Sequence, residues 1–208
     1  MTVYIPSFFN DYEERIILFN NCIESYLALD FNIVVFWMND DLYKIHEDKI
    51  TYIDSKIVLN ASIARNKLLD LFYASDDDLA IFSDDDTVLT SSINYDFEFD
   101  VLSLVNDYTP ELRETHSISS SFLLIKNINK KYGKKCYFDE SLTSNQDLDF
   151  GVNLVSNGLL VYRLKESKIK INRGKSSMFK NDNEKAKMKA KTLNTIINKW
   201  GINKYKWI

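Results

Sequence analysis

The most informative stretch of this sequence is an apolar run that leads into three consecutive aspartates. Residues 79–89 read LAIFSDDDTVL, so four mainly apolar residues and a serine precede Asp84, Asp85 and Asp86. A short apolar run predicts a buried strand of an α/β sheet, and such sheets bind ligands at the carboxyl ends of their strands. Adjacent carboxylates repel one another unless a positive charge lies among them. Because hard divalent cations prefer oxygen ligands, the triplet predicts a site for Mg²⁺ or Mn²⁺.

Strand-like and helix-like segments alternate along the rest of the chain. Further β-prone runs occupy residues 2–9, 32–38, 56–59, 118–125 and 159–163. Helical spacing of apolar residues predicts a helix capped by Asn10 and three more over residues 62–74, 147–157 and 184–199. This alternation predicts an α/β fold in which helices flank a mainly parallel central sheet. Residues 95–107 fit either a strand or a helix, and residues 127–136 read as a polar connection.

The helical periodicity also predicts which side chains face the core. In the helix over residues 62–74 the buried stripe is Ala64, Leu68, Leu71 and Phe72. In the last helix it is Ala186, Ala190, Leu193, Ile197 and Trp200. A second aspartate triplet at residues 76–78 comes before its strand, so we expect it at the opposite end of the sheet, in a solvated turn.

Length and composition limit the classes of protein to which the chain can belong. Its 208 residues suit one domain, and we expect residues 1–170 to form the main domain and residues 171–208 a basic loop and helix packed on it. No apolar run approaches the length of a transmembrane helix and no signal peptide is recognisable, so we expect a cytoplasmic protein. Two cysteines and two histidines are too few for a disulfide framework or a histidine-based zinc site.

Charge is distributed unevenly along the chain. Residues 1–162 hold 12 lysines and arginines against 27 aspartates and glutamates, whereas residues 163–208 hold 14 against 3. A basic C-terminal end is suited to phosphates, nucleic acid or another anionic surface. A lysine-rich helix with a solvated face has the same composition, so both interpretations stay open.

The order of the motifs resembles the GT-A nucleotide-sugar glycosyltransferases, in particular members similar to family 2. The resemblance implies a single Rossmann-like GT-A domain. The resemblance covers about residues 3–163. It rests on the first strand with Pro6, the strand NIVVFWMND, the segment NASIARN at residues 60–66, the Asp-x-Asp of the acidic triplet, and QDLDF at residues 146–150. Ala61 and Gln146 replace the family's usual Gly and Glu, and no histidine follows His116 where many members have a metal ligand.

The resemblance implies roles for the acidic triplet and for Arg65. Asp86 is expected to coordinate Mn²⁺ or Mg²⁺, and Asp84 to bind the metal, a metal-bound water or the ribose. Asp85 shares either task. Arg65 is expected to pair with a phosphate or to stack on the base, because its planar guanidinium suits both. The structural alternatives are an acidic turn without a ligand and an ion pair between Arg65 and a nearby aspartate.

The resemblance also implies further donor-binding residues. Pro6 and Asn66 belong to its matched motifs. Asn39 or Asp40 is expected to accept a hydrogen bond from the imino proton of a pyrimidine base, or simply to cap a turn. Two basic residues, Arg173 and Lys175, lie in a segment that either closes over the diphosphate or is only a basic loop.

Asp147 is the expected general base, because an acceptor hydroxyl is a poor nucleophile until a carboxylate takes its proton. The structural alternative for Asp147 is N-capping of its helix, and Asp149 is the reserve base. An enzyme that retains the configuration of the sugar needs no base in this role.

The implied activity is metal-dependent transfer of a hexose or pentose from a nucleotide diphosphate sugar, with a UDP-sugar favoured. The acceptor is either a bacterial surface glycan or hydroxymethylated cytosine in phage DNA. The second alternative follows from the basic C-terminal end and from a Lys-, Asn- and Ile-rich composition that suggests an AT-rich genome, in which case the enzyme acts in the host cytoplasm.

Two other functions fit parts of the sequence. The strand followed by Asp84, Asp86 and Val88 also fits a haloacid-dehalogenase-like phosphatase, in which Asp84 is a nucleophile. That motif usually opens a chain, whereas three predicted strands precede it here. The other alternative is a non-catalytic module that binds a nucleotide sugar or nucleic acid.

Overall fold

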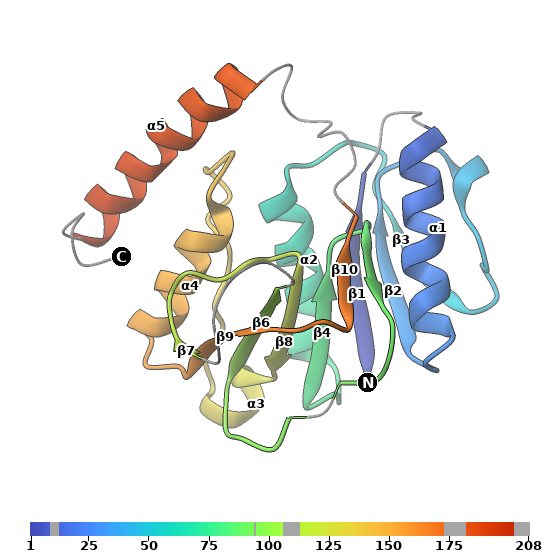
Figure 1. Cartoon of the computed structure of the whole chain (residues 1–208), viewed down its shortest axis with the longest axis horizontal. Coiled ribbons are helices and arrows are strands. Elements are labelled where there is room, and N and C mark those ends of the chain that lie inside the picture. The colour runs from blue at the N-terminus through green and yellow to red at the C-terminus, as the bar shows by residue number, and fades with distance from the viewer. Residues whose placement is uncertain (9–12, 94, 106–112, 173–181, 202–208) are drawn as a thin grey trace.

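The computed structural model describes the chain except for residues 9–12, 94, 106–112, 173–181 and 202–208 (Figure 1). Its centre is an eight-stranded sheet with the order β3-β2-β1-β4-β8-β6-β9-β7. These strands are β1 (Thr2–Ser7), β2 (Asn32–Trp37), β3 (Ile50–Asp54), β4 (Leu79–Ser83), β6 (Val101–Val105), β7 (Arg113–Glu114), β8 (Phe122–Lys126) and β9 (Val161–Lys165). Strands β5 (Thr87–Leu89) and β10 (Ile169–Ile171) form a separate antiparallel pair.

Strand direction confirms the predicted α/β class with a mainly parallel sheet. The pairs β1–β2, β2–β3, β1–β4 and β6–β9 are parallel. Strand β8 runs against both of its neighbours, and β7 runs against β9. The carboxyl ends of β1, β2 and β4 therefore lie at one edge of the sheet, which is the edge where α/β sheets bind ligands.

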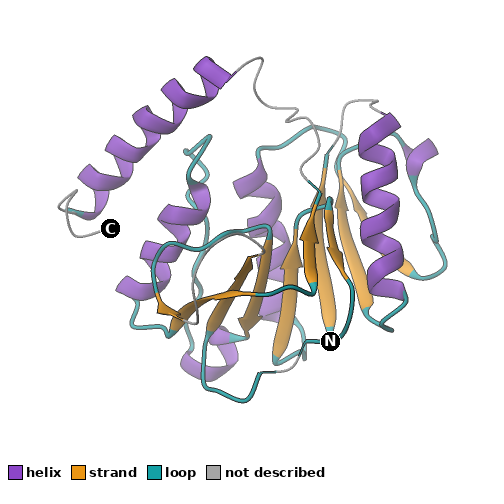
Figure 2. Cartoon of the chain, viewed as in Figure 1, coloured by secondary structure: helices purple, strands orange, loops and turns teal. Residues whose placement is uncertain are grey.

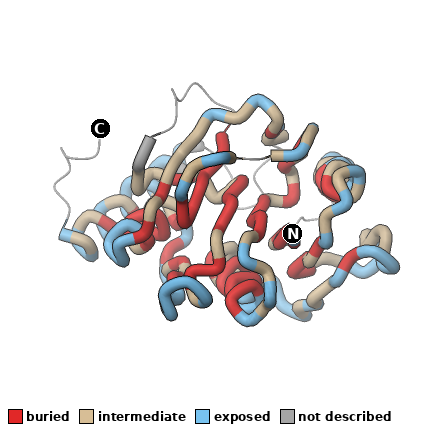
Figure 3. The backbone as a smooth tube through the Cα atoms, turned by 90° about the horizontal axis from the view of Figure 1, so that it is seen from below, coloured by how far each residue is buried: buried red, intermediate tan, exposed pale blue. Residues whose placement is uncertain are grey.

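Helices cover both faces of the sheet (Figure 2). They are α1 (Glu13–Leu27), α2 (Ala61–Ala74), α3 (Ile128–Tyr132), α4 (Gln146–Ser156) and α5 (Asp182–Trp200), with a short 3-10 helix, η1, at Asp41–Tyr43. Side chains alternate along β1, so Val3 and Ile5 join the core cluster that contains α1, whereas Tyr4 joins the cluster of α2, α3 and α4. Figure 3 shows this buried centre between more exposed helices and loops.

Helix α5 contacts the residues directly before α4. Thr192 and Ile196 are its most buried described residues. Asn145 Nδ2 donates to the carbonyl oxygen of Lys189 at 2.8 Å, and Thr192 Oγ1 forms a hydrogen bond with the Ser144 hydroxyl. The predicted stripe is partly wrong, because Ala186 and Ala190 are exposed. The buried face of α5 contains Thr192 and Ile196, which the apolar periodicity did not predict to be buried.

Three other local predictions are wrong. The third strand is β3 at Ile50–Asp54 instead of residues 56–59, since its half-exposed position at the sheet edge needs no continuous apolar run. The predicted connection at residues 127–136 contains α3, which Asn127 caps by accepting a hydrogen bond from the backbone N–H of Lys130. In α2 the predicted Ala64, Leu68 and Phe72 are buried, but Leu71 is 43% exposed and Leu69 is buried in its stead.

Other features agree with the sequence or lie outside the described residues. Within the ambiguous region 95–107, the structure has a strand, β6, at Val101–Val105. Asn60 caps α2 through a 2.9 Å hydrogen bond from the backbone N–H of Ile63. The predicted cap Asn10 lies outside the described residues, as does most of the predicted loop at residues 173–183. No helix in the described part of the chain is long and apolar enough to cross a membrane.

Candidate active site

The acidic triplet forms a tight turn at the carboxyl end of β4. The backbone N–H of Asp84 donates to the carbonyl oxygen of Ser121 at 3.1 Å, and Thr87 N–H donates to the carbonyl oxygen of Asp84 at 3.3 Å. Strand β5 starts directly after the turn, and the three carboxylates contact side chains of β1, α1 and α2. This is the sheet edge that the sequence predicts for the triplet.

Two arginines from different helices pair with the triplet. Arg65 Nη2 of α2 lies 2.6 Å from Asp84 Oδ1, and Arg15 Nη1 of α1 lies 2.9 Å from Asp86 Oδ2. Nη2 of Arg15 also pairs with Asp85 Oδ1. The structural alternative for Arg65, an ion pair with an aspartate of the triplet, is therefore present in this protein, and guanidinium groups supply the positive charge that the repelling carboxylates need.

The three aspartates differ in their access to solvent. The Asp84 and Asp86 side chains are 28% and 15% exposed, whereas the Asp85 side chain is 7% exposed and accepts a 3.1 Å hydrogen bond from Ser7. Burial raises the pKa of Asp85 to about 7, against the opposing effect of Arg15. Burial and the Asp84 charge also raise the pKa of Asp86. Asp84 and Asp86 are thus the carboxylates that a ligand can reach, while Asp85 faces inward.

The ends of β1 and β2 bring Asn39 to this site and leave Asp40 at its margin. Asn39 Nδ2 lies 3.1 Å from the carbonyl oxygen and 3.2 Å from the hydroxyl of Ser7, the residue that binds Asp85. Asp40 is exposed and caps η1 by accepting from the backbone N–H of Leu42 at 3.0 Å. Pro6 lies half-buried in β1, one residue before Ser7.

Asp147 approaches the triplet from α4. It lies in the first turn of that helix, is half-buried, and accepts a 3.0 Å hydrogen bond from the backbone N–H of Leu148. Burial raises the pKa of Asp147, the charge of Arg65 opposes that rise, and the charge of Asp84 adds to it. The N-cap position belongs to Asn145, so Asp147 is not the capping residue of α4. Its electrostatic neighbours are those of the acidic turn.

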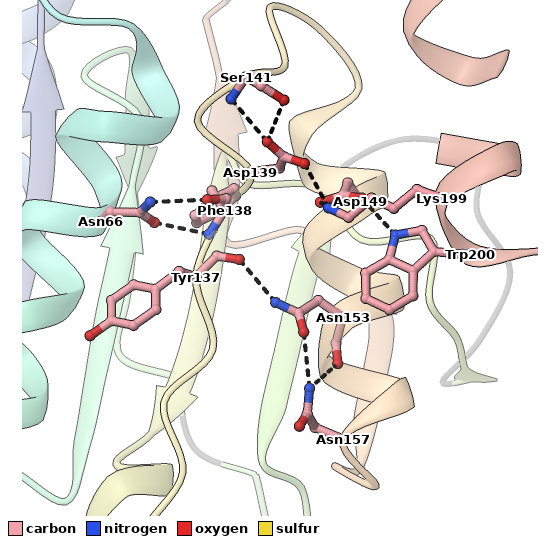
Figure 4. A network of polar contacts seen from close by, with 10 residues as sticks. All are labelled: Asn66, Tyr137, Phe138, Asp139, Ser141, Asp149, Asn153, Asn157, Lys199 and Trp200. Carbon is pink, nitrogen blue, oxygen red and sulfur yellow. Dashed lines mark hydrogen bonds and ion pairs between the residues drawn. The ribbon is translucent and has the colours of Figure 1, made fainter. Parts of the chain in front are cut away.

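Two residues near the predicted site bind other parts of the fold (Figure 4). Asn66 exchanges hydrogen bonds with the backbone of Phe138 at 2.9 and 3.0 Å and donates to Glu140 Oε1 at 3.0 Å. Asp149 is 1% exposed and is bound by Lys199 Nζ and by Trp200 Nε1 of α5. Asn66 therefore fixes the segment before α4, and Asp149 fixes α5, which does not fit the reserve-base role.

The carboxylates at this turn suit a hard cation that is shared with a substrate. Among the described residues, no group of three or more His, Cys, Asp or Glu side chains is arranged to hold a metal ion. Mg²⁺ and similar ions are often held by one or two carboxylates together with substrate phosphates. Asp84 and Asp86 fit this arrangement. Arg173 and Lys175 lie outside the described residues, although Asn172, directly before them, donates its backbone N–H to the Asp86 carbonyl oxygen at 2.9 Å.

Sequence reasoning missed Arg15 and Ser7. Ser7 carries no motif, and its part in holding Asp85 depends on the pairing of β1 with β4. Arg15 had a usable signal, since it is the only basic residue among the first 43 residues of an acidic region. Its partners, Asp85 and Asp86, are 70 and 71 residues away, so only the packing of α1 reveals the pairing.

No family model and no curated protein matches this sequence. Solved structures are similar in fold. TarS 1-349 of S. aureus has a TM-score of 0.57 at 15% identity over 81% of this chain and 58% of that chain. The mannosyltransferase PcManGT of Pyrobaculum calidifontis, in complex with GDP-Man and Mn²⁺, has a TM-score of 0.60 at 12% identity over 95% and 63%.

A β1,4-galactosyltransferase 7 of Drosophila, in complex with manganese, UDP-Gal and xylobiose, has a TM-score of 0.53 at 14% identity over 90% of this chain and 78% of that chain. TarS 1-349 in complex with UDP-GlcNAc has a TM-score of 0.55 at 15% identity over 95% and 72%. The chain spans 58% of the first of these structures and 63% of PcManGT, and it has the GT-A fold of nucleotide-sugar glycosyltransferases.

Proposed function

We propose that this protein transfers a sugar from a nucleotide diphosphate sugar, with a UDP-sugar favoured, to a hydroxyl group of an acceptor. The observation that carries the proposal is the gathering of Asp84, Asp86, Arg65 and Asp147 at one sheet edge of a GT-A fold. Proteins of similar fold bind UDP-GlcNAc, UDP-Gal and GDP-Man, two of them with manganese. These neighbours support a nucleotide-sugar donor and a divalent cation.

In this proposal the acidic turn holds the diphosphate end of the donor. Asp84 and Asp86 would hold Mn²⁺ or Mg²⁺ together with diphosphate oxygens, and the bound cation would neutralise charge that develops on the leaving group. Arg65 lies beside them and pairs with a phosphate, because its forked donors match phosphate oxygens. Asp85 supports the turn from within through Ser7 and Arg15.

The base and ribose end of the donor lies along β1 and β2 in this proposal. The amide oxygen of Asn39 accepts a hydrogen bond from the imino N–H of the base, while its amide nitrogen donates to Ser7 beside the acidic turn. Asp40 is the less favoured partner because its carboxylate caps η1. Pro6 shapes the end of β1, and Asn66 acts indirectly by holding Phe138. Arg173 and Lys175 remain proposed as phosphate-binding residues of the segment after Asn172.

Asp147 acts as the general base for a direct displacement. The acceptor oxygen forms a bond to the anomeric carbon, while the bond from that carbon to the diphosphate oxygen breaks and its electron pair stays on the diphosphate. The hydroxyl proton passes to the Asp147 carboxylate. Burial raises the pKa of Asp147 and makes it a stronger base than an exposed aspartate.

A donor screen tests the proposed function. UDP-glucose, UDP-galactose, UDP-GlcNAc and GDP-mannose are incubated with the protein, with Mn²⁺, with Mg²⁺ and with EDTA, and release of the nucleoside diphosphate is measured. We expect release with at least one donor, and its loss in EDTA and in the Asp86→Asn variant. Absence of both donor binding and release under all conditions would overturn the proposal. Phosphate release from a phosphomonoester would instead support the phosphatase alternative, and binding without any transfer would support the non-catalytic module.

The acceptor is proposed to be either a surface glycan or hydroxymethylated cytosine in phage DNA. Exposed lysines on α5, Lys187, Lys189 and Lys191, support the DNA alternative because phosphate contacts are made chiefly by Lys and Arg. Retention of the protein on duplex DNA is measured across a salt series. Binding that weakens steeply with salt supports DNA as the acceptor. Absence of binding at low salt leaves the surface glycan as the proposed acceptor.

A further inference from the structure

Arg15 has an unusual position for a residue outside the recognised motifs. It extends from the first turn of α1, its side chain is only 13% exposed, and its guanidinium bridges Asp85 and Asp86. Arg65 holds Asp84 from α2 in a corresponding way. Two guanidinium groups thus lie against three consecutive carboxylates.

The contact between Arg15 and Asp86 conflicts with cation binding at the same carboxylate. Nη1 of Arg15 lies 2.9 Å from Asp86 Oδ2, so this oxygen is engaged by a positive group. A divalent cation on Asp86 would meet the guanidinium at close range, where like charges repel strongly in a half-buried site. The pairing observed here and a cation bound by Asp86 are therefore two different states of the same side chains.

The charges of the ligands indicate how the state with a cation on Asp86 becomes favourable. With Mn²⁺ alone, Arg15 loses its contact with Asp86, keeps only Asp85 as a carboxylate partner and gains no new one. The diphosphate of a nucleotide sugar carries about two negative charges, so a cation and diphosphate enter together with little net charge. The diphosphate oxygens also give the displaced guanidinium acceptors that match its fork.

We propose that Arg15 is a switching residue of the donor site: it takes the place of the cation on Asp86 in the donor-free protein and binds the diphosphate once the cation and donor are in place. This inference rests on the proposed function and extends it to a regulation of cation binding. Arg15 makes the cation and the nucleotide bind synergistically, because each favours the state that the other needs.

Calorimetric binding of Mn²⁺ alone, and of UDP or GDP with and without Mn²⁺, tests this inference. We expect the wild-type protein to bind Mn²⁺ weakly alone and roughly 5- to 100-fold more tightly with nucleotide, the range of ordinary coupling energies. In Arg15→Gln we expect Mn²⁺ alone to bind more tightly and nucleotide with Mn²⁺ to bind less tightly. The ratio of the Mn²⁺ affinities with and without nucleotide is expected to fall toward one. Lys130→Gln makes the same change of charge at the opposite end of the sheet and is expected to bind as wild type.

The outcomes separate this inference from the proposed function. If the wild-type protein binds neither nucleotide with Mn²⁺, the proposed function fails. If the wild-type protein binds them synergistically and a folded Arg15→Gln variant keeps the same synergy, or binds Mn²⁺ alone no more tightly, the switching role is wrong. Should Arg15→Gln not fold, as judged by circular dichroism, Arg15→Lys decides, because a single ammonium cannot span both carboxylates. Reduced synergy in Arg15→Lys supports the switch, and unchanged synergy contradicts it.

Discussion

Nη2 of Arg65 lies 2.6 Å from Oδ1 of Asp84, so the first acid of the turn after β4 is held by a guanidinium from α2. The same two charges act on Asp147, whose pKa is raised by burial, lowered by Arg65 and raised by Asp84. The residues proposed to bind the donor and the residue proposed to activate the acceptor are therefore one electrostatic unit. Substitutions at Asp86, Asp147 and Arg65 test this unit, and substitutions at Lys199 and Gly151 test the packing of α5 and α4.

Asp86→Asn is expected to reduce nucleoside diphosphate release by about 100-fold or more, because one of the two accessible carboxylates proposed to hold the cation is lost. The matched control is Asp78→Asn in the other aspartate triplet. The Asp78 side chain is 93% exposed and pairs only with the exposed Lys130 among the described residues, so its loss is expected to leave the rate within twofold of wild type. Equal effects of the two substitutions would contradict the assigned site.

Asp147→Asn is expected to lower kcat by about 10²- to 10⁴-fold, the usual contribution of a general base, with little change in donor binding. Steady-state kinetics with a responsive acceptor, combined with calorimetric donor titration, separates the two effects. A kcat within twofold of wild type would show that Asp147 is not the base.

The pH profile of kcat offers an independent check on Asp147. Only the ionised carboxylate accepts a proton, so kcat is expected to fall as the pH decreases through the pKa of Asp147. Because burial raises this pKa, the fall is expected at a higher pH than for an ordinary aspartate. Arg65→Gln removes the charge that lowers the pKa of Asp147, so at saturating donor it is expected to move the acid limb to higher pH. An acid limb at the same pH as in the wild-type protein would contradict the electrostatic coupling between Arg65 and Asp147.

Lys199→Ala is expected to lower the free energy of unfolding by about 1–3 kcal/mol, between the values of exposed and buried ion pairs, because Asp149 is buried and Lys199 is about one-third exposed. Lys191→Ala, on the exposed side of the same helix, is the control and is expected to change stability by less than about 0.5 kcal/mol. Urea unfolding followed by circular dichroism measures both.

Stability is also expected to depend on pH through Asp139. Burial opposes the effect, but hydrogen bonds from Lys199 and Ser141 lower the pKa of Asp139 to about 2. An aspartate in an unfolded chain has a pKa of about 3.9. The stabilisation from this ionised carboxylate is thus present above about pH 4 and is lost as the pH falls toward 2. Lys199→Ala is expected to reduce the loss of stability over this range, and an identical loss would contradict the assignment.

Gly151→Ala is expected to destabilise α4 against the sheet. A Cβ at this position would lie 1.9 Å from the backbone carbonyl oxygen of His116, and backbone cannot move aside as a flexible side chain can. Overpacking of this kind typically costs about 1–3 kcal/mol. Val155→Ala, at a partly exposed position of the same helix, is the control, and thermal unfolding should separate the two variants.

Several features of the site were predictable because they depend on neighbouring residues. The apolar run before Asp84 predicted β4 and placed the triplet at its carboxyl end, where the structure has it. Helical spacing of apolar residues predicted the helix over residues 147–157, and α4 fully buries Phe150 and Leu154. Short apolar runs and helical periodicity reflect burial on one face of a local element, so a sequence carries this information directly.

The sequence by itself determined the α/β class, the acid-rich end of β4 and the start of α4. The tertiary structure decided that Arg15 meets Asp85 and Asp86, and that Asp149 binds Lys199 instead of facing the site. The physical reason is distance along the chain: these ion pairs join residues about 50 to 71 positions apart, and no local periodicity records them. They form because the packing of α1 and α5 brings opposite charges together in places that exclude water.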